Sequence, residues 1–247
     1  MSLNLIRTRR PLVHCMTNTV VMNFTANGLL SVGASPIMAD AIEEVADIVQ
    51  IADALLINIG TLNARTVASM HVAIETAKKK NIPIVFDPVG AGASAFRLEM
   101  VLQMLSNKQI TLLRCNAGEL AAIVGVNWQA NGVDSGAGDA NIEQLAKEAA
   151  LRFSCLVIVT GKHDILTDGV NVKCIDGGHE KITQITGTGC LLSAISAALL
   201  ASSQEPLRDL EALLRDYKHA AKQAFAPIGT YQVQFLNELE RLSEVKR

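Results

Sequence analysis

The sequence of 247 residues lacks the features that mark several large protein classes. Aromatic residues make up only 4% of it, and 22 Lys and Arg against 24 Asp and Glu leave a formal net charge of −2. Proteins that bind nucleic acid need a strongly basic face to neutralise phosphates, so we do not expect nucleic acid as a partner. Apolar residues make up 49% of the chain, which is too many for an intrinsically disordered protein.

Cysteine pairs and long apolar runs are also missing. The five cysteines are far apart, with no C-x-x-C pair and no histidine at zinc-finger spacing; they are Cys15, Cys115, Cys155, Cys174 and Cys190. This usage predicts reduced thiols and a cytoplasmic location. The most apolar run, residues 191–201, is well short of the ~20 residues that span a bilayer, so it predicts a buried helix and no membrane contact. Basic residues near the N-terminus argue against a signal peptide.

The common phosphate and metal motifs are absent too. The sequence contains no G-x-x-x-x-G-K-[ST], no G-x-G-x-x-G in a strand-to-helix turn, no H-E-x-x-H and no EF-hand loop. P-loop, dinucleotide-binding and zincin interpretations are therefore excluded, and any phosphate chemistry must use another scaffold.

What is present is an alternation of short aliphatic runs with longer helical patterns. Four runs are almost continuously apolar, as strands buried on both faces are; they cover residues 54–59, 82–86, 110–113 and 156–160. Helices are predicted between them, one capped by Asp40 with Glu43 as its returning partner and another over residues 66–80. The pattern predicts an α/β fold in one domain, residues 1–247, with a mostly parallel central sheet covered by helices.

The later part of the chain departs from a pure strand–helix repeat. Asp168 and Gly169 predict a two-residue hairpin turn, which makes the last strands antiparallel. Beyond Cys190 the pattern is helical, with residues 207–225 and 231–242 separated by Pro227 and Gly229. Small polar residues at 132–138 predict a loop that could serve as a lid.

Polar side chains follow three of the predicted strands directly. They are Asp87, then Arg114, Asn116 and Glu119, and then Thr160. Ligands of open α/β sheets bind beyond the carboxyl ends of the strands. There, two carboxylates suit Mg²⁺ held through waters and phosphates, and an arginine suits a phosphate. The alternative for each residue taken singly is a turn or a helix cap.

The sharpest local signal is the run Thr186-Gly187-Thr188-Gly189-Cys190 before the apolar helix. Glycines at a helix N-terminus leave backbone N–H groups free to bind an anion such as a transferring phosphoryl group. The alternative is a tight turn before a buried helix. Cys190 lies in the first helical turn, where the helix dipole is expected to lower the thiol pKa enough for a modest general base. The alternative is a buried structural cysteine.

Taken together, the motif Asn116-x-x-Glu119 and the Gly-x-Gly turn resemble the ribokinase-like superfamily. Five further blocks resemble the hydroxyethylthiazole kinase family within it, over nearly the whole chain: residues 11–18, 23–30, 33–38, 58–62 and 86–92. Most sugar kinases of the superfamily have Asp where this chain has Cys190, and the family has Cys. The resemblance implies a ribokinase-like three-layer sandwich.

The resemblance also implies an activity, namely transfer of the ATP γ-phosphate to the hydroxyl of 4-methyl-5-(2-hydroxyethyl)thiazole in thiamine salvage. Cys190 would be the base facing that hydroxyl, and Mg²⁺ would be required. Family members are similar in forming homotrimers with active sites across subunit interfaces.

Site residues follow from the same resemblance. The thiazole pocket would be lined by Asn18, Met38, Gly60 and Gly187. ATP would contact Arg114, Thr160, Asn116 and Gly189, and Mg²⁺ would be bound by Asp87 and Glu119.

Two alternatives to this activity remain open at the level of sequence. One is a related superfamily enzyme, such as a kinase of pyridoxal or pyrimidine alcohols or an ADP-forming repair lyase. The other is a catalytically silent oligomer that binds a thiazole or a nucleotide. One position also departs from the family, because Cys115 stands where Gly is usual. If its φ is positive, Cys115→Gly is predicted to stabilise the protein.

Overall fold

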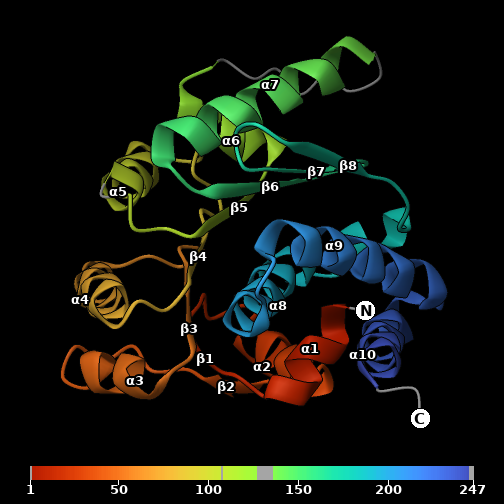
Figure 1. Ribbon diagram of the computed structural model, residues 1–247, viewed down its shortest axis with the longest axis horizontal. Coiled ribbons are helices and arrows are strands. Elements are labelled where there is room, and N and C mark those ends of the chain that lie inside the picture. Colours follow the sequence, from red (N-terminus) through yellow and green to blue (C-terminus); the bar gives the residue numbers. More distant parts are fainter. Residues whose placement is uncertain (1, 107, 127–135, 245–247) are drawn as a thin grey trace.

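The protein is built around one eight-stranded sheet in the order β2-β1-β3-β4-β5-β6-β7-β8 (Figure 1). The computed structural model describes residues 2–106, 108–126 and 136–244, with the backbone alone for 136–141. The strands are β1 Leu12–Met16, β2 Ser35–Ile37, β3 Ala54–Asn58, β4 Ile84–Asp87, β5 Leu112–Asn116, β6 Leu156–Thr160, β7 Asp164–Thr167 and β8 Val172–Ile175. Neighbours from β2 to β6 are parallel, while β7 and β8 are antiparallel. The predicted mostly parallel sheet is confirmed.

Helices cover both faces of the sheet and complete the predicted three-layer sandwich (Figure 1). One face carries α1 Ser2–Arg9, α2 Met22–Ser31, α8 Thr188–Ser202, α9 Pro206–Gln223 and α10 Ile228–Ser243. The other face carries α3 Val45–Ile51, α4 Ala64–Lys80, α5 Ala95–Ser106, α6 Ala117–Val124 and α7 Gly136–Phe153. The two ends of the chain are neighbours, since α1 packs against α9 and α10.

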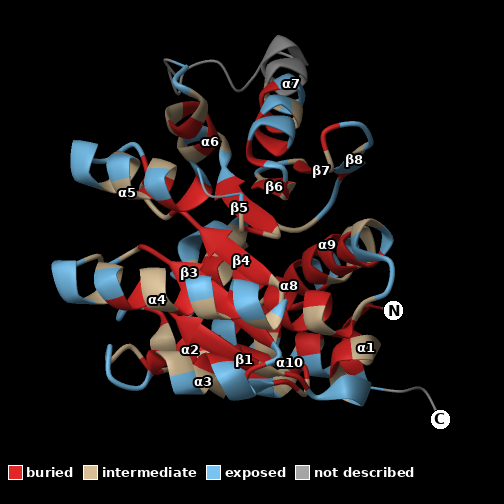
Figure 2. Ribbon diagram, turned by 60° about the vertical axis from the view of Figure 1, so that its left-hand side comes forward, coloured by how far each residue is buried: buried red, intermediate tan, exposed pale blue. Residues whose placement is uncertain are grey.

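The strands bury both faces, which explains why their sequences do not alternate. In β3, Leu56 belongs to the hydrophobic core on the α8 side, and Leu55 and Ile57 belong to the core on the α4 side. Successive side chains of a strand point to opposite faces, so a doubly covered strand must be apolar at nearly every position. Figure 2 shows the strands buried between the two helical layers.

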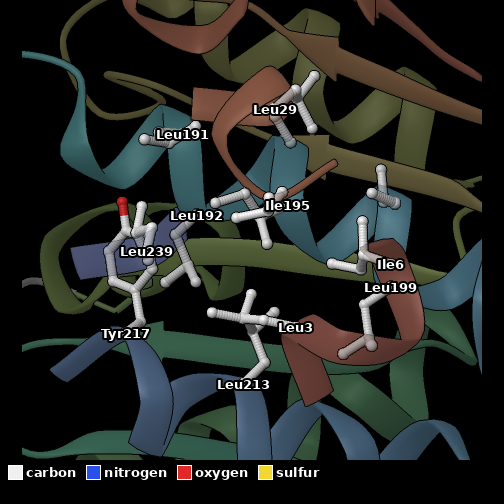
Figure 3. Close-up of a cluster of buried hydrophobic side chains, with 14 of the residues drawn as sticks. Leu3, Ile6, Leu29, Leu191, Leu192, Ile195, Leu199, Leu213, Tyr217 and Leu239 are labelled. Carbon is white, nitrogen blue, oxygen red and sulfur yellow. The ribbon is translucent and has the colours of Figure 1, made fainter. Parts of the chain in front are cut away.

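Helix α8 lies at the centre of its layer and is surrounded by other elements. Leu191, Ile195 and Leu199 lie on it among side chains of α1, α2, α9 and α10 (Figure 3). Twelve of its residues are buried, including Ser193 and Ser196. The predicted buried helix is therefore confirmed. No helix in the described ranges has both the length and the apolar character needed to cross a bilayer.

Two helix starts differ from the prediction. Helix α3 begins at Val45 with Glu44 at its N-cap, so Asp40 does not cap it. The chain turns over residues 41–45 through backbone hydrogen bonds, and the Asp40 carboxylate pairs with Arg65 at 3.0 Å instead. Helix α4 begins two residues earlier than predicted, because Asn63 caps it through a capping box.

The hairpin and the C-terminal helices show smaller differences. The connection between β7 and β8 has four residues, 168–171, and not two. The Asp168 carboxylate accepts hydrogen bonds from the backbone N–H groups of Val170 and Asn171, which stabilises this longer loop. Helix α10 begins at Ile228, so Gly229 lies in its first turn and only Pro227 stands outside it.

Cys115 lies inside β5 and is not among the described non-glycine residues with positive φ. The expected strain is therefore absent, and the predicted gain in stability from Cys115→Gly is wrong, because extended backbone accepts a cysteine without cost. The proposed lid at 132–138 falls mostly outside the described residues; its last three residues begin α7.

Candidate active site

The carboxyl ends of four central strands and the N-terminus of α8 form the candidate site. Strand β4 ends one residue later than predicted and β5 three residues later, so Asp87 and Asn116 are the last residues of these strands and not loop residues. Strand register places Asn58 beside Asp87 and Asn116 beside Thr160. Parallel pairing therefore brings these polar side chains to one edge of the sheet, as the sequence predicted.

Asp87 is the most buried charged group of the site. One carboxylate oxygen, Oδ2, accepts a hydrogen bond from Ser193 of α8 at 2.8 Å and lies 3.7 Å from Nη1 of Arg114. The other oxygen, Oδ1, is buried without a hydrogen-bond partner among the described residues. Burial raises the pKa of Asp87, while the Arg114 guanidinium and the Ser193 hydroxyl oppose that rise. An unpaired buried carboxylate oxygen of this kind suits a cation.

Asn116 and Glu119 form a reciprocal cap at the start of α6. The side chain of Asn116 accepts from the backbone N–H of Glu119 at 2.9 Å, and Oε2 of Glu119 accepts from the backbone N–H of Asn116 at 2.9 Å. Oε1 of Glu119 accepts from the N–H of Gly90 in the loop after β4, also at 2.9 Å. The capping alternative is thus realised, and it ties the ends of β4 and β5 together. Each carboxylate oxygen keeps a second lone pair that could bind Mg²⁺.

Cys190 lies beside two asparagines from β3 and from the segment after β1. Nδ2 of Asn18 donates to Oδ1 of Asn58 at 2.9 Å and lies 3.6 Å from Sγ of Cys190. The backbone N–H of Gly60 donates to the same Asn58 oxygen at 3.0 Å. These bonds fix the amide group of Asn18 against the thiol, so the predicted residues Asn18, Gly60 and Cys190 are brought together.

The expected lowering of the Cys190 pKa is wrong. Burial, with the nearby Asp87 carboxylate, raises the pKa of this thiol to about 11. Desolvation disfavours the thiolate, and Cys190 is only 9% exposed. This effect outweighs the stabilisation that the positive end of the α8 dipole gives to the thiolate.

Two glycines permit close approaches around Cys190. A Cβ on Gly60 would lie 2.7 Å from the side chain of Asn18, and one on Gly187 would lie 2.7 Å from Val21. Gly187 also has φ of 93°, which glycine adopts without cost. Met38 lies just beyond the edge strand β2 and packs, partly buried, against the core on the α8 side. No described hydrogen bond or contact joins Met38 to Cys190, so its place in the pocket remains a prediction.

A cavity of about 520 Å³ opens on the other side of Arg114. Its polar wall includes three of the four predicted ATP residues, Arg114, Thr160 and Gly189, whereas Asn116 is not among the lining residues of the described chain. Leu192 and Tyr217 supply part of an apolar wall. The lining also contains Gly161, Lys162, Asp164, Gly177, Gly178, His179, Glu180, Ile182, Thr183, Thr188, Lys218 and Ala221. The cavity thus combines a cationic, amide-rich end with an apolar wall, which suits a ligand carrying both phosphates and a ring.

Arg114 separates this cavity from the Cys190 cluster. Its guanidinium donates to the hydroxyl of Thr160, and a Cβ on Gly189 would lie 2.5 Å from Nη1. Only glycine leaves room at the α8 N-terminus for this arginine. Arg114 is therefore held between the Asp87 carboxylate on one side and the cavity on the other.

Sequence reasoning missed two supporting side chains. Ser193 gave no signal because a serine in an apolar helix has no distinctive spacing. Arg97 of α5 donates from its two terminal nitrogens to the carbonyl oxygens of Ile59 at 2.6 Å, Val89 at 2.8 Å and Gly60 at 2.8 Å. It fastens the loops after β3 and β4 to each other, a role that only the tertiary structure reveals.

Comparison with known proteins gives one consistent result. Residues 3–245 match the model of the "Hydroxyethylthiazole kinase family". The chain is 52% identical over 242 residues to a hydroxyethylthiazole kinase of Lysinibacillus sphaericus, covering 97% of this chain and 95% of that protein. The solved hydroxyethylthiazole kinase of Pyrococcus horikoshii superposes with a TM-score of 0.89 at 40% identity, covering 98% of this chain and 92% of that one.

A more distant neighbour shares the fold alone. Pyridoxal kinase of Staphylococcus aureus, solved in complex with AMP-PCP, has a TM-score of 0.68 at 15% identity and covers 87% of this chain and 89% of that one. The match over nearly the full length and the high identity settle the relationship: the chain belongs to the hydroxyethylthiazole kinase family.

Proposed function

We propose that the protein transfers the γ-phosphate of ATP to the hydroxyl group of 4-methyl-5-(2-hydroxyethyl)thiazole, as a step of thiamine salvage. The observation that supports this most directly is the placement of Arg114 and Asp87 between a 520 Å³ cavity and the Cys190 cluster. A phosphoryl group that passes from a nucleotide in the cavity to an alcohol beside Cys190 would cross a cationic group and the N-terminus of α8.

ATP would occupy the cavity. Its adenine ring would pack on the apolar wall formed by Leu192 and Tyr217, and its phosphates would extend toward Arg114, Thr160 and Gly189. Asn116 lies at the same strand ends, next to Thr160. Charge spreads over the transferring oxygens in phosphoryl transfer, so fixed donors at this end would supply most of the catalytic effect.

Mg²⁺ would be held by Asp87 and Glu119, mainly through waters and phosphate oxygens. The buried, unpaired Oδ1 of Asp87 and the remaining lone pairs of Glu119 fit a hard cation. When bound, the ion neutralises charge on the β- and γ-phosphates. The chain's own part is to hold both carboxylates at adjacent strand ends.

The thiazole alcohol would bind against Asn18, Gly60, Gly187 and Met38, with its hydroxyl near Sγ of Cys190. With a pKa of about 11, only about one thiol in 10⁴ is ionised at pH 7. Because a neutral thiol cannot take up a second proton, only this ionised fraction would act as the base, taking the substrate proton and becoming the thiol. A positioned base typically contributes ~10²- to 10⁴-fold, and we place Cys190 at the low end of that range.

The organisation of the enzyme is part of the same proposal. Residues 1–247 act as one kinase domain in the cytoplasm, and three copies assemble as the family resemblance implies. Two large apolar residues at helix α2 are well exposed, Val20 just before the helix at 69% and Leu30 on it at 57%. A subunit interface would cover them.

The direct test is mass-spectrometric detection of phosphorylated hydroxyethylthiazole after incubation with Mg-ATP. Cys190→Ala is compared with Cys155→Ala, which removes another buried thiol from the opposite core, and pyridoxal serves as a competing substrate. We expect Mg²⁺-dependent product that falls about 10²-fold only in Cys190→Ala. Thiazole binding without product would establish the silent binder, and preferential phosphorylation of pyridoxal would establish the related enzyme.

A further inference from the structure

Three metal-binding types of side chain meet at the open end of the β7–β8 hairpin, outside every group used above. His163 immediately precedes β7, Cys174 is the third residue of β8, and Asp176 immediately follows β8. One donor atom from each lies within 4.8 Å of the other two. The imidazole Nδ1 of His163 already contacts Oδ1 of Asp176.

The hairpin register explains why these three side chains meet. Asp164 pairs with Ile175 and Ile165 with Cys174, so the next position places His163 opposite Asp176. Cys174 and Asp176 are two residues apart, and side chains at that spacing point to the same face of a strand. The cluster is therefore a product of regular backbone pairing.

The donor set favours one class of metal. A thiolate, an imidazole and a carboxylate together suit Zn²⁺ and similar divalent transition metals, whereas Mg²⁺ and Ca²⁺ prefer oxygen alone. At metal–ligand lengths of ~2.0–2.3 Å, tetrahedral donors lie roughly 3.5 Å apart. The donor atoms lie within 4.8 Å of one another, so reaching this spacing needs shifts of about 1 Å, inward for the most distant pair and outward for the His163–Asp176 contact. Exposed side chains make such shifts readily. His163 is 34% and Asp176 is 76% exposed, so an ion can enter from solvent.

We propose that His163, Cys174 and Asp176 form a binding site for a divalent transition metal of the zinc class, with three protein ligands and one position open to water. Binding replaces the thiol proton of Cys174 with the metal and releases that proton to solvent. The imidazole binds in its neutral form and the carboxylate in its ionised form.

The position of the site gives the metal a structural consequence. The segment containing Gly161, Lys162 and Asp164 lines one wall of the 520 Å³ cavity, and the segment from Gly177 lines another. Gly177 and Gly178, directly after Asp176, both have positive φ. A metal bound between His163 and Asp176 would clamp together the two segments of chain that carry these walls. The metal would limit the movement of these two segments away from each other, although it is not bound by residues that line the cavity.

The test is titration of the full-length, chelator-treated protein with Zn²⁺ by calorimetry and with Co²⁺ by absorption spectroscopy, without nucleotide. The variants are Cys174→Ser, His163→Gln and Asp176→Asn. His219→Gln, which changes an exposed histidine on α9, is the matched control. Circular dichroism checks that each variant is folded.

We expect one Zn²⁺ per chain and a thiolate-to-cobalt charge-transfer band in the wild type and in His219→Gln. Cys174→Ser should abolish the band, and each of the three ligand variants should weaken Zn²⁺ binding by at least about tenfold. At the same Zn²⁺ concentration, amide hydrogen exchange over residues 161–180 should slow in the wild type and in His219→Gln, and not in the three ligand variants. Zn²⁺ binding that is unchanged in Cys174→Ser and His163→Gln would overturn the site, as would a Co²⁺ spectrum without a thiolate band. Unchanged exchange with intact binding would overturn the clamp.

Discussion

Two buried serines on α8 allow a sharp test of how the site is held together. Ser193 and Ser196 are both fully buried on the same helix. Ser193 donates its hydroxyl proton to Oδ2 of Asp87 at 2.8 Å, whereas the hydroxyl of Ser196 has no hydrogen-bond partner among the described residues. Replacing each with alanine removes the same atom from the same helix, but only one replacement takes a donor from a buried charge.

The expected difference can be worked out from these contacts. A hydrogen bond to a charged group contributes about 1.5–3 kcal/mol to stability. Alanine regains up to about 0.5 kcal/mol of helix propensity at either position. Ser193→Ala should therefore lower the free energy of unfolding by about 1–2.5 kcal/mol, and Ser196→Ala should leave it unchanged or raise it slightly.

The pH dependence adds a second requirement. Burial raises the pKa of Asp87 in the folded state, so ionisation of this carboxyl group opposes folding. The free energy of unfolding therefore falls as the pH rises through the folded-state pKa. Ser193 holds this pKa down, and removing the hydroxyl raises it further. The loss of unfolding free energy in Ser193→Ala, relative to the wild type, should therefore be largest above the folded-state pKa of Asp87 and shrink as the pH falls.

Urea unfolding followed by circular dichroism, repeated from neutral to acidic pH, measures both effects. Equal losses in Ser193→Ala and Ser196→Ala would refute the reasoning, because the loss would then come from packing. A loss of unfolding free energy in Ser193→Ala that grows on acidification would refute the claim that Ser193 stabilises the ionised carboxylate of Asp87.

Three further predictions concern the site directly. Gly189→Ala places a Cβ 2.5 Å from Arg114 and should raise the KM for ATP at least about tenfold, whereas Gly229→Ala, where nothing lies within 4 Å, should leave it unchanged. Equal KM values of the two variants in steady-state assays would contradict the importance of this close contact. Arg97→Ala frees the carbonyls of Ile59 and Gly60 and should raise the KM for the thiazole alcohol more than that for ATP, with partial recovery in Arg97→Lys. The same rise in both KM values would show a general structural role. The rate of Cys190 alkylation by iodoacetamide, measured by peptide mass spectrometry, should rise about tenfold per pH unit from pH 7 to 9, because the pKa of the thiol is raised to about 11 and only the thiolate reacts. A rate that levels off below pH 9 is incompatible with that pKa.

The sheet and the residues at its edge were predictable because both follow from local pattern. Continuous apolar runs identify strands buried on both faces, and parallel pairing then brings Asp87, Asn116 and Thr160 to one edge without further information. The strand ends were misplaced because Arg114 and Asn116 look like loop residues in sequence, although neighbouring elements supply partners for them inside the sheet.

What could not be predicted depends on contacts between distant parts of the chain. The Asp40 carboxylate pairs with Arg65 and does not cap α3, which no local rule anticipates. The Cys190 pKa depends on how completely the fold buries the thiol and on Asp87, which lies over a hundred residues away in sequence. Arg97 donates hydrogen bonds to backbone carbonyls of two loops, and every residue type has such a carbonyl, so the sequence does not show which residues are its partners.

The layered arrangement also constrains how the chain can acquire its structure during synthesis. One face of the sheet is covered by α8, α9 and α10, which are synthesised after every strand, together with α1 and α2, which are synthesised before most of the strands. Until α8 has been synthesised, the apolar surface of β1, β3 and β4 lacks the helix that packs against all three strands, and until α9 and α10 have been synthesised, α1 lacks its partners. The candidate site needs the strand ends up to Thr160 of β6 and also the N-terminus of α8, which begins after Gly187. Activity therefore arises only after α8 has been synthesised, and until then the nascent chain exposes an apolar surface that can associate with other chains.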